Sequence, residues 1–260
     1  MRIITGWNEV KAVNRLQLIS IAFLTCASFS VSAAEGSGTQ MSSVKLGATR
    51  VIYPLNAKGV TLSVTNPQDF PVLVKSVVKD ELQRKDAPFY VTPPLFRLDG
   101  GQKNALNITR TGGDYPSDRE SINWICVQGI PPKADSAWAE EGEKGAGSGK
   151  VSMNVQVIIS SCIKLFVRPE SVNGNPADMA DKITWKMEGK NIVASNPTPF
   201  YMNVDDISFN GKKADMSRSY IPPFSSERIQ VPSGGAAKGT LKWTVIGDYG
   251  EKREKTTQIK

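Results

Sequence analysis

The stretch 151-VSMNVQVIISSCIKLFVRP-169 decides the fold class of this chain of 260 residues. In its first nine residues, apolar and polar side chains largely alternate, which is typical of a β-strand with one apolar face. The stretch follows a charged, glycine-rich run, 142-GEKGAGSGK-150, which has the composition of a flexible loop, and it contains Cys162 and Lys164. An ordinary core-facing strand is the usual explanation for such alternation. The loop, the cysteine and the lysine raise the question of whether this strand does more.

The rest of the chain shows the same pattern of short strands and turns. Segments with alternating side chains, punctuated by proline and glycine, favour β-sandwiches, and no helical repeat is visible. Prolines make 88–98 an edge strand or an interrupted strand, and the small, polar residues 35–47 are expected to be mobile. We therefore predict an all-β protein of two sandwiches, residues 35–168 and 169–260. The expected strands are 48–55, 60–66, 72–80, 88–98, 103–110, 120–130, 151–159, 182–187, 191–196, 199–209, 227–232 and 240–249.

The first 34 residues have the features of a secretory signal peptide. A basic region precedes the apolar run 16-LQLISIAFLTCASFSVSAA-34, which ends in small residues. Signal peptides combine these features, and we expect cleavage after Ala33 or Ala34. The alternative is a membrane anchor, which a short and interrupted apolar run disfavours.

Composition argues against several classes of function. The chain has no histidine, so the usual general base of hydrolases and the commonest metal ligand are absent. The glycine-rich run 142–150 lacks the spacing of a phosphate-binding loop. Without residues 1–34, which hold three basic and one acidic side chain, the net charge of +7 becomes +5. This charge is small and dispersed and does not indicate nucleic-acid binding. We predict that the protein is not an enzyme and uses no cofactor or metal.

Two cysteines, Cys126 and Cys162, lie outside the first 34 residues. In an exported protein they are expected to form a disulfide bond, and two buried free thiols are the alternative. If they face each other on antiparallel strands, paired residue numbers sum to 288 and Ile130 faces Ile158. The two prolines after Ile130 end the partner strand, so residues 151–157 would have no partner on that side. An apolar overhanging strand is a template for pairing with another chain, which makes strand addition a hypothesis for the function.

Two basic residues lie in apolar surroundings, Arg50 in 48-ATRVIYPL-55 and Lys164 in 163-IKLFV-167. Half-buried cations need partners. They either form internal salt bridges or bind an external anion, such as the terminal carboxylate of a peptide. Lys164 is even-numbered and the apolar stripe is odd-numbered, so a flat strand places them on opposite faces unless twist or a bulge intervenes.

Six further motifs belong together: 50-RVIYP-54, 93-PPLFRLDGGQKNALNI-108, 116-PSDRESINWICVQGIPP-132, 162-CIKLFVRP-169, 195-SNPTPFYMNV-204 and 220-YIPP-223. With these motifs the chain resembles one family, the PapD-like periplasmic chaperones of the chaperone–usher pathway. The resemblance covers nearly all of the chain after the signal peptide. The long loop, the cysteine pair and the extended alternating strand resemble the subfamily with a long loop before the donor strand, which serves thin or amorphous adhesive fibres.

The resemblance implies two immunoglobulin-like sandwiches in an L-shaped arrangement. It implies a chaperone that lends its alternating strand to fibre subunits lacking their last strand and passes them to an outer-membrane usher. The subunit's terminal carboxylate would bind Arg50 and Lys164. The alternatives are a structural or adhesive fibre protein built of the same sandwiches and a periplasmic enzyme, and the apolar stripe makes self-association of the free protein an expectation. The donated side chains would be Val151, Met153, Val155, Val157 and Ile159.

Overall fold

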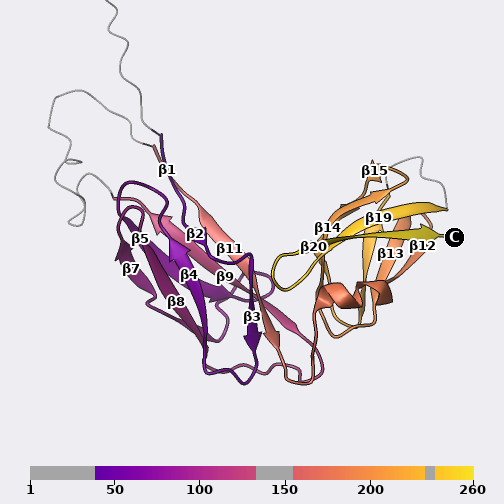
Figure 1. The fold of residues 1–260 in the computed structure, drawn as a ribbon, viewed down its shortest axis with the longest axis horizontal. Helices are drawn as coiled ribbons and strands as arrows, with labels where there is room; N and C mark the ends of the chain where they lie inside the picture. Colours follow the sequence, from indigo (N-terminus) through magenta and orange to yellow (C-terminus); the bar gives the residue numbers. More distant parts are fainter. Residues whose placement is uncertain (1–38, 133–154, 232–237) are drawn as a thin grey trace, which may run out of the picture. The chain divides into compact units, whose positions relative to one another are not determined.

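The structure is a computed structural model that describes residues 39–132, 155–231 and 238–260. These ranges consist of β-strands, connecting turns and one short 3₁₀ helix, so the all-β prediction is confirmed (Figure 1). No helix in the described ranges is long and apolar enough to span a membrane. The strands form two β-sandwiches, which lie within one unit, Ser37–Lys260.

The first sandwich packs a five-stranded sheet, in the order β3-β11-β9-β5-β7, against a four-stranded sheet, in the order β2-β4-β8-β6. Alternating side chains from both sheets meet in one core, in which Tyr53, Leu106 and Leu165 are fully buried. The strands are β2 (Lys45–Leu46), β3 (Arg50–Pro54), β4 (Val60–Thr65), β5 (Val72–Lys79), β6 (Phe89–Thr92), β7 (Leu95–Leu98), β8 (Lys103–Arg110), β9 (Ser121–Ile130) and β11 (Ser160–Arg168).

The predicted interruption of 88–98 is confirmed. Pro93 and Pro94 separate β6 from β7, and the two strands lie at edges of different sheets. Proline has no backbone N–H to donate to a ladder, which is why the chain leaves one sheet there and joins the other.

The second sandwich has a four-stranded sheet, in the order β12-β13-β18-β16, and a sheet in the order β15-β14-β19-β20 with β17 paired to β14. Its core contains Trp185 and Trp243, whose ring centroids are 4.9 Å apart. The 3₁₀ helix η2 (Pro176–Lys182) precedes the first strand, and the side chain of Asn175 caps it. The strands are β12 (Thr184–Glu188), β13 (Asn191–Asn196), β14 (Met202–Phe209), β15 (Lys212–Lys213), β16 (Asp215–Met216), β17 (Tyr220–Ile221), β18 (Ser225–Gln230), β19 (Gly239–Ile246) and β20 (Lys252–Ile259).

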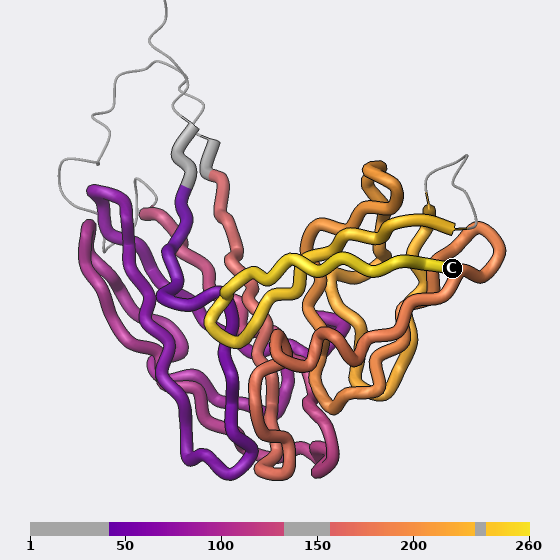
Figure 2. The backbone as a smooth tube through the Cα atoms, turned by 45° about the vertical axis from the view of Figure 1, so that its right-hand side comes forward, coloured from indigo at the N-terminus to yellow at the C-terminus, as the bar shows by residue number. Residues whose placement is uncertain are grey.

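The expectation that 35–47 is mobile is wrong for the described part of that segment. β1 (Thr39–Ser42) pairs in parallel with β10 (Val155–Ile158), and the two segments run side by side in Figure 2. Ser42 is fully buried and Val44 is 5% exposed. Both lie over Gly129, where an added Cβ would be 3.0 Å from Val44 Cγ1 and 3.3 Å from Ser42 Oγ. The missing side chain of Gly129 therefore makes room for a polar segment whose composition alone suggests a loop.

Two organisational predictions remain predictions. The domain boundary between residues 168 and 169 is one, and the L-shaped arrangement of the sandwiches is the other. The expected signal peptide, residues 1–34, lies outside the described residues.

Candidate partner-binding site

Arg50 and Lys164 lie side by side on neighbouring strands. β3 runs parallel to β11, and Arg50 is the ladder partner of Lys164. Ile163 and Leu165 pack in the core of the first sandwich, so Lys164 faces the opposite side of the sheet. Within β11, the odd-numbered residues face the core and Lys164 faces the other side. No bulge is therefore needed to explain why Lys164 and the odd-numbered residues differ.

In the part of the chain that the structure describes, the ammonium of Lys164 makes its hydrogen bonds and ring contacts with uncharged groups. Its Nζ donates to Asn203 Oδ1 at 2.7 Å and to Ser219 Oγ at 3.0 Å. It also lies over the rings of Tyr220 and Trp124, at 5.0 and 5.9 Å from their centroids. Burial, and secondly the charge of Arg50, lowers the pKa of Lys164 to about 8. The contacts hold the ammonium in place without neutralising it.

The guanidinium of Arg50 is also incompletely satisfied. Its Nη1 donates to the carbonyl oxygen of Ile246 at 3.3 Å, and its buried Nε has no hydrogen-bond partner among the described residues. Burial lowers the pKa of Arg50, and the negative charges of Asp248, Glu251 and Glu120 oppose this effect.

Neither Arg50 nor Lys164 forms an ion pair with a carboxylate in the part of the chain that the structure describes. The geometry therefore favours the external-anion alternative over internal salt bridges. Two adjacent cations form a site that a carboxylate fits in charge and in hydrogen bonding. We call Arg50 and Lys164 the anion site.

Arg168 shows by contrast what an internally neutralised cation looks like in this protein. Its guanidinium pairs with Glu120 at 2.6 Å and with Asp248 at 2.7 Å. Glu120 also accepts a 2.8 Å hydrogen bond from the amide of Tyr201. Burial raises the pKa of Glu120 to about 7, and the charge of Arg168 opposes that rise. Two of the carboxylates that act on Arg50 are thus already bound by Arg168.

The predicted donor strand is described only in its second half. Val151 and Met153 lie outside the described residues, and Val155 is the first residue of β10. Side chains farther along are partly open to solvent, with Val157 and Ile159 each 37% exposed. Large apolar side chains are thus accessible along this segment, as the hypothesis of strand addition requires.

The predicted register with β9 is confirmed for the residues of β11, but it is wrong for the residues that precede β11. β9 and β11 pair from Val167 with Ser121 to Ser160 with Gln128, so paired numbers sum to 288 as expected. The ladder ends there, however, and Ile158 pairs with Ser42 of β1 instead of Ile130. The residues before Ser160 therefore extend beyond β9 by more than predicted. In the described part, Val155–Ile158 pairs with β1 instead.

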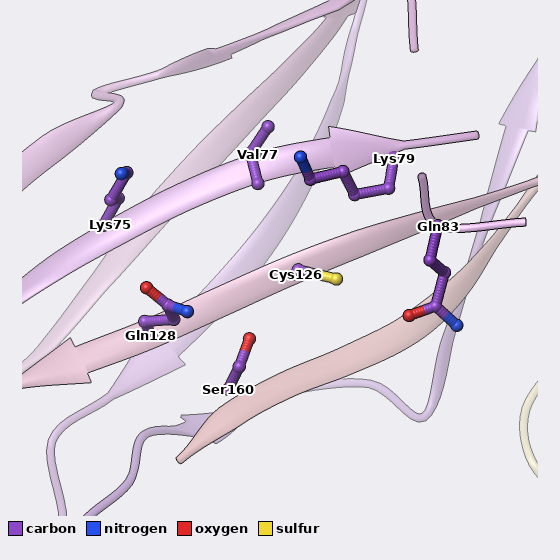
Figure 3. Close-up of a pocket in the computed structure, with 7 residues that line it drawn as sticks. All are labelled: Lys75, Val77, Lys79, Gln83, Cys126, Gln128 and Ser160. Carbon is purple, nitrogen blue, oxygen red and sulfur yellow. The ribbon is translucent and has the colours of Figure 1, made fainter. Parts of the chain in front are cut away.

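The disulfide bond between Cys126 and Cys162 is present and joins the paired residues of β9 and β11. A hollow of about 250 Å³ lies beside it on the outer face of the five-stranded sheet (Figure 3). Arg50 and Lys164 do not line this hollow, so we place the candidate site at the two cations and not here. The lining residues are Lys75, Val77, Lys79, Gln83, Cys126, Gln128 and Ser160.

Sequence reasoning missed the residues that hold Lys164. Asn203, Ser219 and Tyr220 belong to the second sandwich and lie far from β11 in the chain. Asn203 and Tyr220 fall within the motifs 195–204 and 220–223, so the sequence marked the segments but gave no reason to link them to Lys164. Trp124 likewise lies within a motif, 116–132, and is the ladder partner of Lys164 on β9.

The fold and the site define a class: a two-sandwich, immunoglobulin-like protein with a partly exposed apolar strand and an anion site. Comparison with known proteins gives the family. Residues 43–173 match the N-terminal domain of the PapD pili and flagellar-assembly chaperones, and residues 178–257 match the C-terminal domain of the PapD pili assembly chaperone. This chain therefore belongs to the PapD family of pilus-assembly chaperones.

Individual relatives agree with this assignment. The chaperone protein AfaB of Escherichia coli is 49% identical over 227 residues, which cover 84% of this chain and 91% of AfaB. The crystal structure of the E. coli chaperone DraB superposes with a TM-score of 0.74 at 47% identity, over 86% of this chain and all of DraB. The chaperone SafB of Salmonella enterica, solved in complex with the SafA pilin, gives 0.73 at 39% identity, over 85% of this chain and 99% of that one. These relatives are chaperones, which favours the chaperone hypothesis over that of a fibre protein.

Proposed function

We propose that this protein captures and folds surface-fibre subunits in the periplasm by donor-strand complementation and delivers them to an outer-membrane usher. The observation that carries the proposal is the anion site, in which two half-buried cations on neighbouring strands have no carboxylate partner among the described residues. The C-terminal carboxylate of a subunit supplies the missing charge and two acceptor oxygens. This function needs binding and release but no bond chemistry.

The apolar stripe supplies the rest of the binding energy in this proposal. Val157 and Ile159 are partly exposed, and each large apolar side chain that becomes buried contributes roughly 1.5–3 kcal/mol. A relative of 39% identity, SafB, has been solved with a pilin bound. Export is supported by the signal-like composition of residues 1–34 and by the disulfide bond, which is typical of proteins outside the cytoplasm.

Co-expression with the fibre subunits encoded beside this protein tests donor-strand complementation. Wild-type chaperone should purify as a one-to-one complex with a subunit, and Val155→Asp with Val157→Asp should abolish the complex, because charged side chains do not enter an apolar groove. Leu95→Asp is the control, since Leu95 is 55% exposed but lies on β7, three strands from β11 at the far edge of the sheet. Capture of subunit by the double variant would refute the assignment of the donor strand.

The same assay tests the anion site. Arg50→Ala and Lys164→Ala should each weaken capture roughly 30-fold or more, because each leaves the subunit's carboxylate with one cation instead of two. The thermal midpoint of the free chaperone should be unchanged or slightly higher, since neither residue has an internal ion pair in the described chain. A large fall in the midpoint with unchanged capture would contradict the proposal.

A further inference from the structure

The hairpin between β19 and β20, residues 247–251, presents an unusually exposed aromatic side chain. Tyr249 is 92% exposed, against 57% for Leu82 and 56% for Tyr90, the next most exposed large apolar side chains that the structure describes. Its ring and hydroxyl make no hydrogen bond or ring contact with any described residue. The side chain therefore contributes little to the stability of the free protein.

The backbone below Tyr249 is nevertheless firmly held. The carboxylate of Asp248 accepts two hydrogen bonds of 2.7 Å from Arg168. The carboxylate of Glu251 accepts from the amide of Tyr249 at 2.9 Å and from Asn175 at 2.7 Å. Residues on both sides of Tyr249 are thus fixed, so the ring is presented by a loop with little conformational freedom to lose.

The hairpin also adjoins the anion site. The carbonyl oxygen of Ile246 accepts the hydrogen bond from Arg50. On the other side of the tip, a Cβ added to Gly250 would lie 2.7 Å from Thr49 Oγ1, in the residue before Arg50. The hairpin therefore packs against the chain that enters β3, and the tip that bears Tyr249 lies at the rim of the anion site.

We infer that Tyr249 contacts the last residues of the bound subunit, next to the carboxylate held by Arg50 and Lys164. This inference rests on the proposed function. An aromatic ring on a rigid loop gives a large contact area at a small cost in entropy, and its hydroxyl can bond a peptide group. The occupant is an extended peptide segment that ends in a free carboxylate, because the hairpin that bears the ring adjoins the anion site.

A refolding assay tests the inference with the subunit captured in the co-expression experiment. The subunit is unfolded in urea and diluted into increasing concentrations of chaperone, and the yield of complex is measured. Tyr249→Ala should raise the half-maximal chaperone concentration about three- to tenfold, which corresponds to the usual worth of an aromatic contact. Tyr249→Phe keeps the ring and should stay within about twofold of the wild type.

Two comparisons separate failure of the inference from failure of the proposed function. Tyr90→Ala removes another exposed tyrosine, on the edge strand β6, and should behave as the wild type. If Tyr249→Ala also behaves as the wild type while Arg50→Ala loses capture, the inference is wrong and the proposed function stands. If Arg50→Ala captures normally, the proposed function itself fails. A lowered thermal midpoint in Tyr249→Ala would assign the residue a structural role and overturn the inference.

Discussion

Arg50 and Lys164 resemble Arg168 in burial but differ from it in electrostatic environment. Arg168 has two carboxylates within 2.7 Å, whereas the contacts of Lys164 are an amide, a hydroxyl, a carbonyl and two rings. A buried cation without a counter-charge is unfavourable in a free protein. Because the two cations are ladder partners, they also repel each other. The pair therefore adds little to the stability of the free protein, which agrees with the proposal that it binds an external anion.

The pKa of Lys164 predicts the pH dependence of capture. A carboxylate partner binds the protonated ammonium, and Lys164 loses its proton as the pH rises through about 8. Capture should therefore be strongest below pH 8 and weaken above it, by at most about tenfold per pH unit. The measurement is the half-maximal chaperone concentration in the refolding assay across this range.

Lys164→Arg is the control for this pH dependence. Arginine stays protonated throughout the range, so the variant should show a flatter profile whatever its absolute affinity. Identical profiles for the wild type and Lys164→Arg would show that another group is titrating.

At the scale of elements, β1, which pairs with β10 outside the two sheets of the first sandwich, packs against β9 through Ser42. Ser42 and Val44 lie over Gly129, and an added Cβ would already meet Val44 at 3.0 Å. Gly129→Val adds two methyl groups beyond that Cβ and should displace the segment from β10. Hydrogen exchange of the amides in 39–46 should become faster by at least about tenfold, since local opening then costs less free energy.

Gly112→Ala is the matched control, because no atom lies within 4 Å of a Cβ added there. It should leave exchange in 39–46 unchanged. Exchange in Gly129→Val that equals the wild type would mean that the packing over Gly129 does not hold β1.

Most strands could be predicted from the sequence because their side chains alternate and prolines mark their ends. The register of β9 and β11 followed from the cysteine pair. β1 could not be predicted, because 39-TQMS-42 has no apolar stripe. The segment packs where Gly129 of β9 has no side chain. β20 is a charged edge strand, 252-KREKTTQI-259, and has the composition of a surface loop. The local sequence pattern predicts strands that have an apolar face. Strands held by residues distant in the chain can be located only from the tertiary structure.

The candidate site shows the same division. Arg50 and Lys164 are predicted as site residues because cations are conspicuous within apolar strands. The structure makes them ladder partners, and their binding role stays a prediction. Asn203 and Ser219 are not predicted, because neutral polar residues carry no signal of their own in a sequence. Which residues approach Lys164 depends on how the second sandwich contacts the first, and no periodicity encodes that contact.

At the scale of the whole molecule, the buried network of Glu120, Arg168 and Asp248 links the two sandwiches. Glu120 precedes β9, Arg168 ends β11, and Asp248 lies in the hairpin of the second sandwich. Glu120 also accepts from the amide of Tyr201, in the second sandwich. One carboxylate therefore joins elements that are distant in the chain.

Removing this carboxylate should destabilise the protein strongly. Glu120→Ala leaves the amide of Tyr201 unsatisfied and Arg168 with one counter-charge, and breaking a buried pair costs about 3–5 kcal/mol. Urea unfolding should report a loss of free energy of this order. Asp118→Ala removes the partner of a solvent-exposed ion pair two residues away and should have no measurable effect. Equal effects of the two substitutions would show that the network is not a major source of stability.

The lowered pKa of Lys164 sets stability and binding against each other. Because the folded protein holds the proton less tightly than the unfolded chain, whose value is 10.5, folding is penalised below about pH 8. The penalty is relieved as the pH rises from about 8 towards 10.5. Over the same interval the anion site loses one of its two positive charges, that of Lys164. If Lys164 binds the subunit's carboxylate as proposed, the charged form that favours binding is also the form that disfavours folding. Selection for thermostable variants would then select against binding.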